Sequence, residues 1–206
     1  MRSKGEQTRQ AILDAAIPRF GREGYRATSV ADVARDARVG ITVPYAYFLN
    51  KETLFLDALD EDAAGVISEG LNSILDDPEV ADWHQALFST LFEAVERHPL
   101  ARRMLAGLEP DVTDRVLEIP ALADLRVAVA ERLQGQQAAG TVRPDIDVVA
   151  IANGIVAITL SLLMSAVQVG GVASSAYAGD VSAVFRAAVG TGSGHGVRPV
   201  SAVNSV

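Results

Sequence analysis

The stretch TSVADVARDARVGITVPYAYFLNK, residues 28–51, decides how this 206-residue chain folds near its N-terminus. Ser29 followed by Asp32 is a capping-box pattern, in which each side chain can bond the backbone amide of the other residue at the start of a helix. Apolar residues then recur at helical spacing over residues 30–37, and a tight turn is expected at residues 38–40. The stretch therefore predicts a short capped helix followed by a turn.

A further short helix is expected after the turn, from Ile41 to Phe48, with Phe48 facing the core. It would present Ile41, Thr42 and Val43 at its leading end, where a recognition helix meets the edges of bases. Upstream, residues 8–24 carry an apolar stripe and end at a glycine, which predicts the first helix of the same domain. Three helices with a tight turn between the last two have the outline of a DNA-reading helix-turn-helix.

The charge of the chain is divided unevenly along its length. The chain carries a net charge of -8, yet residues 1–51 hold nine Lys or Arg against five Asp or Glu, a net charge of +4. The remaining 155 residues therefore carry -12. A basic head on an acidic body attracts phosphate at one end and repels it elsewhere, so nucleic-acid binding would be oriented and dependent on salt.

One set of residues within 8–55 forms a recognisable pattern: Ala27-Thr28-Ser29-Val30, Asp32-Val33-Ala34, Ala37, Val39, Tyr45, Tyr47-Phe48 and Lys51-Glu52. Through these positions residues 8–55 resemble, without a gap, the DNA-binding domain of the TetR family of repressors. The resemblance implies an all-α fold, with the N-terminal three-helix domain followed by a larger helical domain for ligand binding and dimerisation. It also implies binding to double-stranded operator DNA as a homodimer.

Three positions depart from the family pattern. Arg38 replaces the usual turn glycine, Gly40 replaces a capping serine, and Pro44 replaces a leucine within the recognition helix. A side chain at positive φ is uncommon, and proline beyond the first turn removes an amide donor. An alternative register takes residues 40–42 as the turn and Thr42 as the cap, which places Pro44 in the first turn. The ungapped register is favoured because it keeps the tyrosines in step with the family.

The resemblance implies that Thr28, Tyr45, Tyr47 and Lys51 hold backbone phosphates, while the residues at the leading end of the recognition helix face the major groove. Those residues are small and largely apolar, so readout through thymine methyl groups and one Thr hydroxyl is expected. The complete set of candidate DNA-binding residues is Thr28, Ser29, Arg38, Gly40, Ile41, Thr42, Val43, Tyr45, Tyr47 and Lys51. Ordinary packing inside the three-helix domain is the alternative role for the two tyrosines.

Beyond Lys51 the apolar spacing is helical almost throughout, and no stretch alternates as a strand would. Helices are predicted at residues 52–75, 79–97, 100–106, 112–137 with a break at Pro120, 147–168 and 180–189. Asp76-Asp77-Pro78 is expected to end the first of these. Residues 190–206 have no periodic face and are expected to form a disordered tail. The predicted domains are thus 1–51, 52–189 and the tail 190–206.

Residues 148–179 contain no charged side chain. Their length would permit a membrane span, but polar residues interrupt the stretch and no Lys or Arg cluster flanks it. A helix that is apolar on all sides is more simply explained by packing on its own domain and on a second subunit. The resemblance assigns the dimer interface to the same region, where small residues would permit close approach: Ala150, Asn153, Gly154, Ala157 and Ser161.

A lipophilic small-molecule effector is the expected partner of the helical domain. Its site is assigned to apolar residues of the middle helices, with Asn153 or Thr159 as a polar anchor. The candidates are Trp83, Phe88, Phe92, Met104, Leu105, Leu125, Val129, Ile155, Ile158, Thr159 and Leu162. Plain core packing is the alternative role for each apolar member of this set.

Catalysis is not expected. His84, His98 and His195 are far apart and form no metal-spaced pair, and the chain has no cysteine, no glycine-rich phosphate loop and no nucleophile elbow. The paired carboxylates at residues 60–62 and 76–77 fit solvated helix ends. No cofactor and no metal are therefore predicted.

The sequence favours a cytoplasmic, ligand-responsive homodimeric regulator, most simply a repressor. A helical interaction protein whose degenerate helix-turn-helix no longer binds DNA is the alternative, and a membrane-anchored helical protein comes third. Steep loss of duplex binding with added salt separates the first two possibilities.

Overall fold

The computed structural model describes residues 3–75, 83–110, 119–169 and 174–190. Within these ranges the chain is helical and has no strand; Val142 and Gly190 form one isolated antiparallel bridge. The elements are α1 (Lys4–Ala27), α2 (Val30–Asp36), the 3-10 turn η1 (Val43–Ala46), α3 (Lys51–Leu75), α4 (Trp83–Arg97), α5 (Pro99–Leu105), α6 (Ala121–Ala138), α7 (Val148–Val169) and α8 (Ser174–Val189). The expected all-α fold is confirmed.

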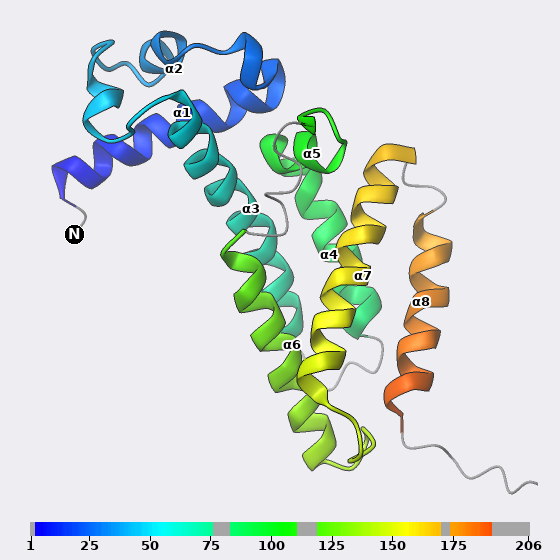
Figure 1. Ribbon diagram of the computed structural model, residues 1–206. Coiled ribbons are helices and arrows are strands. Elements are labelled where there is room, and N and C mark those ends of the chain that lie inside the picture. Colours follow the sequence, from blue (N-terminus) through cyan, green and yellow to red (C-terminus); the bar gives the residue numbers. More distant parts are fainter. Residues whose placement is uncertain (1–2, 76–82, 111–118, 170–173, 191–206) are drawn as a thin grey trace, which may run out of the picture.

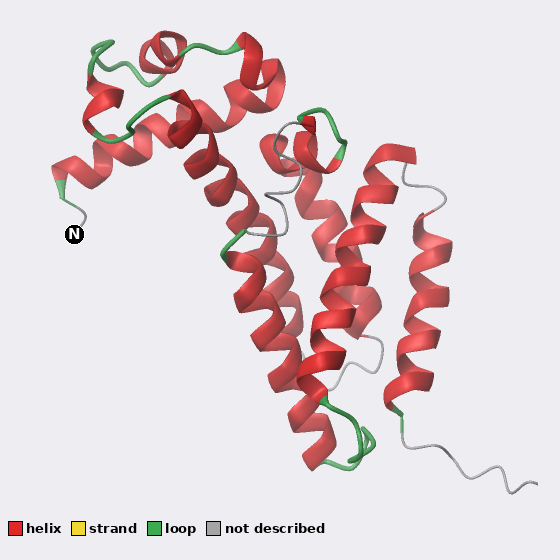
Figure 2. Ribbon diagram, viewed as in Figure 1, coloured by secondary structure: helices red, strands yellow, loops and turns green. Residues whose placement is uncertain are grey.

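The described helices form a small head and a longer body (Figure 1). In the head, α1 lies across one end of the molecule with α2 and η1 above it. The long helix α3 begins in the head and runs down into the body beside α4 and α6. The short helix α5 lies between the body and α1, and α7 and α8 are on the side of the body away from α3. Figure 2 shows that loops are short between most of these helices.

The head has an aromatic and aliphatic core of its own. Ile12, Phe20, Val33, Phe48 and Phe55 are almost completely buried. Phe20 and Phe55 meet edge to face with ring centroids 5.1 Å apart. Because Phe55 belongs to α3, the helix that enters the body also completes the core of the head, and the expected inward orientation of Phe48 is confirmed.

Helix α1 is interrupted near its end by Gly24. The expected stop at residue 24 is visible as a break, because Gly24 has φ 84° and ψ 170° while a last helical turn continues to Ala27. Positive φ is open to glycine at little cost. The backbone therefore leaves the regular helix one turn early, which frees the next amide, that of Tyr25, for a partner outside the helix.

The predicted body helices agree closely with the observed ones where the structure describes them. The helix starts predicted at residues 79 and 112, the helix end at 76–78 and residues 191–206 of the expected tail lie outside the described residues. Pro120 stands at the N-cap of α6 rather than inside a longer helix. The last helix was predicted too short, since α8 begins at Ser174 rather than near residue 180. Its first residues are small and carry no periodic signal.

Helix α7 is apolar enough and long enough to cross a membrane by composition alone, the one such helix among the described residues. It packs chiefly against α6, and its buried side chains include Ala152, Ile155, Val156 and Leu163. A single helix of this kind is weak evidence for a membrane, since core helices of soluble proteins have the same composition.

Candidate nucleic-acid interface

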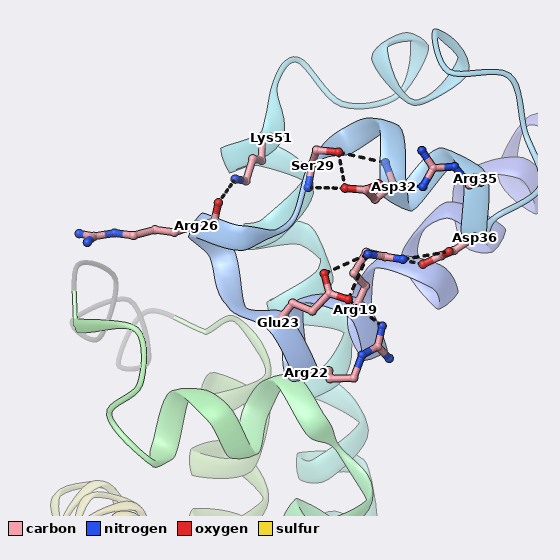
Figure 3. A network of polar contacts seen from close by, with 9 residues as sticks. All are labelled: Arg19, Arg22, Glu23, Arg26, Ser29, Asp32, Arg35, Asp36 and Lys51. Carbon is pink, nitrogen blue, oxygen red and sulfur yellow. Dashed lines mark hydrogen bonds and ion pairs between the residues drawn. The ribbon is translucent and has the colours of Figure 1, made fainter.

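The start of α2 is fixed by the predicted capping box (Figure 3). The Asp32 amide donates to Ser29 Oγ at 3.1 Å, and the Ser29 amide donates to Asp32 Oδ2 at 3.3 Å. The Ser29 hydroxyl also donates to the Asp32 carboxylate, and this bond, followed by that from Arg35, lowers the pKa of Asp32. The Ser29 side chain therefore caps α2 and positions this helix.

The turn after α2 begins at Arg38, as the ungapped register predicts. Arg38 has φ 56°, the left-handed conformation for which the family pattern has glycine. It is the one non-glycine residue with positive φ among the described residues. A left-handed L-residue costs on the order of 1 kcal/mol, so the turn stores a small strain. The Arg38 side chain is exposed at this turn, directly before the recognition element.

The predicted recognition helix from Ile41 to Phe48 is wrong in type and length. Residues 43–46 form a single 3-10 turn, η1, in which the Tyr45 amide donates to the Thr42 carbonyl at 3.2 Å. Pro44 has no amide to donate and disfavours helical backbone at the residue before it, so an α-helix cannot propagate through this point. The alternative register was right about one feature, because Thr42 is the N-cap and Pro44 lies in the first turn. The Thr42 side chain makes no capping hydrogen bond.

The 3-10 turn divides the candidate base-contacting residues between solvent and core. Ile41 is 63% exposed and Tyr45 57% exposed, and Thr42 is exposed as well. Val43 is half-buried and packs against the core, while Pro44 is buried. Ile41, Thr42 and Tyr45 therefore form the outward edge of this element.

The candidate phosphate-binding side chains differ in how accessible they are. Thr28 is 2% exposed, and its hydroxyl has no hydrogen-bond partner within the described part of the chain. Tyr47 is half-buried, with its hydroxyl beside the N-terminus of α1, where a Cβ on Gly5 would lie 3.9 Å away. Lys51 Nζ lies 4.5 Å from the centre of the Tyr25 ring and donates to the Arg26 carbonyl at 3.4 Å (Figure 3).

Several arginines of the head are held by acids. Arg19 Nε donates to Asp36 at 2.5 Å and Arg19 Nη1 to Glu23 at 2.9 Å, which ties α1 to α2 (Figure 3). The hydrogen bond from Arg19 lowers the pKa of Asp36 and raises that of Arg19. No local sequence pattern predicts this ion pair, because residues 19 and 36 belong to separate helices. In the described part of the chain, Lys4 and Arg38 take no part in an ion pair, which leaves them available to phosphate.

A second candidate site lies in the body. An apolar cavity of about 60 Å³, partly open to solvent, lies among α3, α4, α5, α6 and α7. Its lining residues are Leu59, Ala63, Val66, Ile67, Leu91, Val95, Ala101, Met104, Leu105, Ile119, Leu122, Leu125, Val156, Thr159, Leu160 and Leu163. Thr159 is the one polar residue of this lining.

The cavity brings together four of the eleven predicted effector residues, namely Met104, Leu105, Leu125 and Thr159. The others do not line it: Trp83, Phe88, Val129 and Ile155 are buried in the core, Phe92 and Leu162 are half-buried, and Ile158 is 42% exposed. Asn153 is exposed, so Thr159 is the polar anchor that the geometry supports. The α3 wall was missed, although the stripe of Leu59, Val66 and Ile67 was visible in the sequence as an apolar face.

The head and body together define a class of protein, a helix-turn-helix domain joined to an all-helical domain with an apolar cavity. Residues 12–58 match the family described as bacterial regulatory proteins, tetR family. Residues 12–58 are therefore a TetR-type DNA-binding helix-turn-helix, and the chain as a whole is similar to transcriptional regulators rather than to enzymes.

Known proteins share the fold over nearly the whole chain. A TetR-family transcriptional regulator from Cytophaga hutchinsonii has a TM-score of 0.70 at 21% identity, covering 93% of this chain and 99% of that one. The regulator FadR from Bacillus subtilis, solved in complex with stearoyl-CoA, has a TM-score of 0.66 at 18% identity, covering 85% and 96%. In sequence, the HTH-type transcriptional regulator YdgC of Bacillus subtilis is 24% identical over 182 residues, covering 82% of this chain and 87% of its own length.

Proposed function

We propose that the protein is a cytoplasmic, homodimeric repressor that binds operator DNA through its head and releases it when a small lipophilic effector enters the body. The observation that carries the proposal is the combination of an outward-facing recognition turn with an apolar cavity in one chain. The units proposed are the DNA-binding domain at residues 1–51 and the ligand-binding and dimerisation domain at residues 52–189.

DNA contact is assigned to the exposed edge of the recognition turn and the side chains around it. Ile41 and Thr42 would meet bases, through thymine methyl groups and a hydroxyl, since neither offers the bidentate bonds that read purines. Arg38, Tyr45 and Lys51 would hold phosphates, which fix the register on the duplex without reading sequence. Val43 and Ser29 support this surface from within the domain.

Dimerisation is assigned to the outer face of α7. Val149 and Ile158 on this helix are exposed, as are the small residues predicted for the interface, among them Gly154 and Ala157. On α8, Val184 is 64% exposed. An apolar face of two neighbouring helices, left uncovered by the rest of the chain, fits a second copy of the same face related by two-fold symmetry. A dimer also gives two recognition elements, which can enter successive major grooves.

The cavity favours an uncharged, hydrocarbon-rich effector. Its lining includes no charged residue, and burying an unpaired charge there would be very costly. The FadR neighbour was solved in complex with stearoyl-CoA, a ligand with a long alkyl chain, and this supports a lipophilic effector. Hydrophobic contact with the alkyl part and one hydrogen bond to Thr159 are the interactions available.

The first test is an electrophoretic shift with duplexes from the region upstream of the gene, comparing wild type, Tyr45→Phe and Lys51→Ala. Specific binding that weakens steeply with salt and falls in both variants supports the proposal. Tyr45→Phe removes only the hydroxyl, so unchanged affinity would remove Tyr45 from the phosphate contacts. A folded dimer that binds no duplex specifically would favour the alternative of a helical interaction protein, which the short, proline-containing recognition turn makes worth testing.

Dimerisation and effector binding have separate tests. Ala157→Glu, on the exposed face of α7, is expected to dissociate the dimer in sedimentation experiments, whereas Ala123→Glu on the exposed face of α6 is not. For the effector, uncharged lipophilic compounds are expected to raise the melting temperature by binding the native state alone. Stabilisation that persists unchanged in Thr159→Val would show that the hydroxyl is not a polar anchor.

A further inference from the structure

Helix α5 lies where the cavity meets the DNA-binding head. Ala101, Met104 and Leu105 on this seven-residue helix form part of the cavity wall. At its N-terminal end, Pro99 packs so closely on Gly21 of α1 that a Cβ on the glycine would stand 2.7 Å from Pro99 Cβ. The same short helix thus contacts both the candidate effector site and the head (Figure 1).

A carboxylate just beyond α5 holds the interrupted end of α1. Because Gly24 leaves the helical conformation, the amide of Tyr25 points away from the helix ladder, and it donates to Glu109 Oε1 at 3.0 Å. Arg103 Nε, from α5, donates to the same oxygen at 2.7 Å. Glu109 is 9% exposed, so both bonds to its charge form where water competes little.

From these contacts we infer that Glu109 is a positioning residue that couples the state of the cavity to the placement of the DNA-binding surface. The inference deepens the proposed function and rests on it, since it concerns how occupancy of the cavity would reach the head. Arg103 lies on the same rigid turn as Met104, so a displacement of the cavity wall moves both side chains. Glu109 passes this displacement to the backbone of α1 at Tyr25.

Beyond Glu109, contacts continue from Tyr25 to a candidate phosphate-binding residue. The Tyr25 ring meets Phe55 edge to face at 5.1 Å, and Lys51 Nζ lies over the same ring, 4.5 Å from its centre. Lys51 also donates to the carbonyl of Arg26, the residue after Tyr25. A shift of the α1 end therefore moves the groups that hold the Lys51 ammonium.

The other end of α5 is tied to the proposed dimer helix. Gln168 Nε2, near the end of α7, donates to the Leu105 carbonyl at 2.9 Å. At the start of α5, the buried carboxylate of Asp62 accepts from the amides of Leu100 and Ala101 at 2.8 and 2.9 Å. Hydrogen bonds to the body therefore hold α5 at both ends. Glu109, just beyond α5, is the charged residue that contacts the head.

The experiment compares wild type, Glu109→Gln and the matched control Glu96→Gln. Glu96 also pairs with an arginine of α5, Arg102, but this pair is exposed. Amide hydrogen exchange at Tyr25 is expected to accelerate about tenfold in Glu109→Gln, because a neutral acceptor without the arginine pair holds the amide less firmly. The control should exchange as wild type does. Equal exchange at Tyr25 in all three proteins overturns the inference.

Coupling is tested with a bulky residue in place of an effector. Ala63→Leu, on the α3 wall of the cavity, adds three carbon atoms opposite α5. In the wild-type background it is expected to weaken operator binding and accelerate Tyr25 exchange; in the Glu109→Gln background the effect on operator affinity should largely disappear. An equal loss of operator affinity in both backgrounds overturns the role of Glu109 while supporting a responsive cavity. A third outcome is possible, in which Ala63→Leu leaves operator affinity unchanged while Glu109→Gln alters exchange at the Tyr25 amide. In that case both the coupling and the release of DNA by an effector are refuted, and only the hydrogen bond between Glu109 and the Tyr25 amide is supported.

Discussion

The contact between Gly21 and Pro99 allows a prediction in which two opposing effects can be weighed. Gly21 lies in the interior of α1, where alanine would ordinarily stabilise a helix by about 1 kcal/mol. Here, however, a Cβ would stand 2.7 Å from Pro99 Cβ, 2.8 Å from the Pro99 carbonyl carbon and 3.1 Å from the Leu100 amide nitrogen. Two of these atoms belong to the backbone, so no side-chain rotation relieves the overlap.

The steric cost is expected to exceed the propensity gain. Overpacking costs about 1–3 kcal/mol, and contact with backbone places Gly21→Ala near the upper end. After the helix propensity is subtracted, the free energy of unfolding should fall by about 2 kcal/mol, which lowers the melting temperature by roughly 4–8 °C for a chain of this size. Since α1 must move away from α5 to fit the methyl group, operator affinity should fall as well.

Gly135→Ala is the matched control. Gly135 lies in α6 with nothing within 4 Å of a Cβ, so the propensity gain acts alone and stability should rise by up to about 1 kcal/mol. Urea denaturation of both variants, followed by far-UV circular dichroism, measures the difference. A Gly21→Ala protein as stable as Gly135→Ala would refute the reasoning, because it would mean that α1 and α5 separate without cost.

Three further substitutions have definite expected outcomes. Asp62→Ala leaves two buried α5 amides without their acceptor, so the free energy of unfolding measured by urea denaturation should fall by about 3 kcal/mol. Asp62→Asn keeps an acceptor oxygen and should lose less; equal losses in the two variants would contradict the capping role. Arg38→Gly removes the strain of a positive φ but raises the conformational entropy of the unfolded chain, so the melting temperature should stay the same or rise slightly. Operator affinity should fall, because the guanidinium is lost. A clear drop in melting temperature would argue against strain in the turn. Arg19 lowers the pKa of Asp36, so this carboxylate stabilises the fold above the pKa of the unfolded chain and the contribution is lost as the pH falls through the folded pKa. Asp36→Asn should therefore cost up to about 1 kcal/mol at pH 7, an amount limited because the side chain is 37% exposed, and progressively less as the pH falls through the pKa of Asp36 in the folded protein; a difference independent of pH would contradict the ion pair.

Local patterns account for what could be predicted about the head. The capping box of Ser29 and Asp32 and the inward Phe48 depend on residues a few positions apart, so capping and periodicity specify them, whereas the left-handed turn at Arg38 followed from the family resemblance. The length of the recognition helix was misjudged because the family pattern was given more weight than Pro44. The chemistry of proline at that position was readable from the sequence.

The sequence by itself determined the helical class, the ends of most described helices, the basic head and the long apolar α7, because each follows from short-range spacing or composition. Only the tertiary structure decided which apolar residues enclose the cavity, since every buried helix face looks alike in sequence and the lining is set by how five helices meet. It also decided the contact of Glu109 with Tyr25, two residues 84 positions apart. That contact depends on a break in α1 and on the docking of α5, and no local pattern encodes the docking of one helix on another.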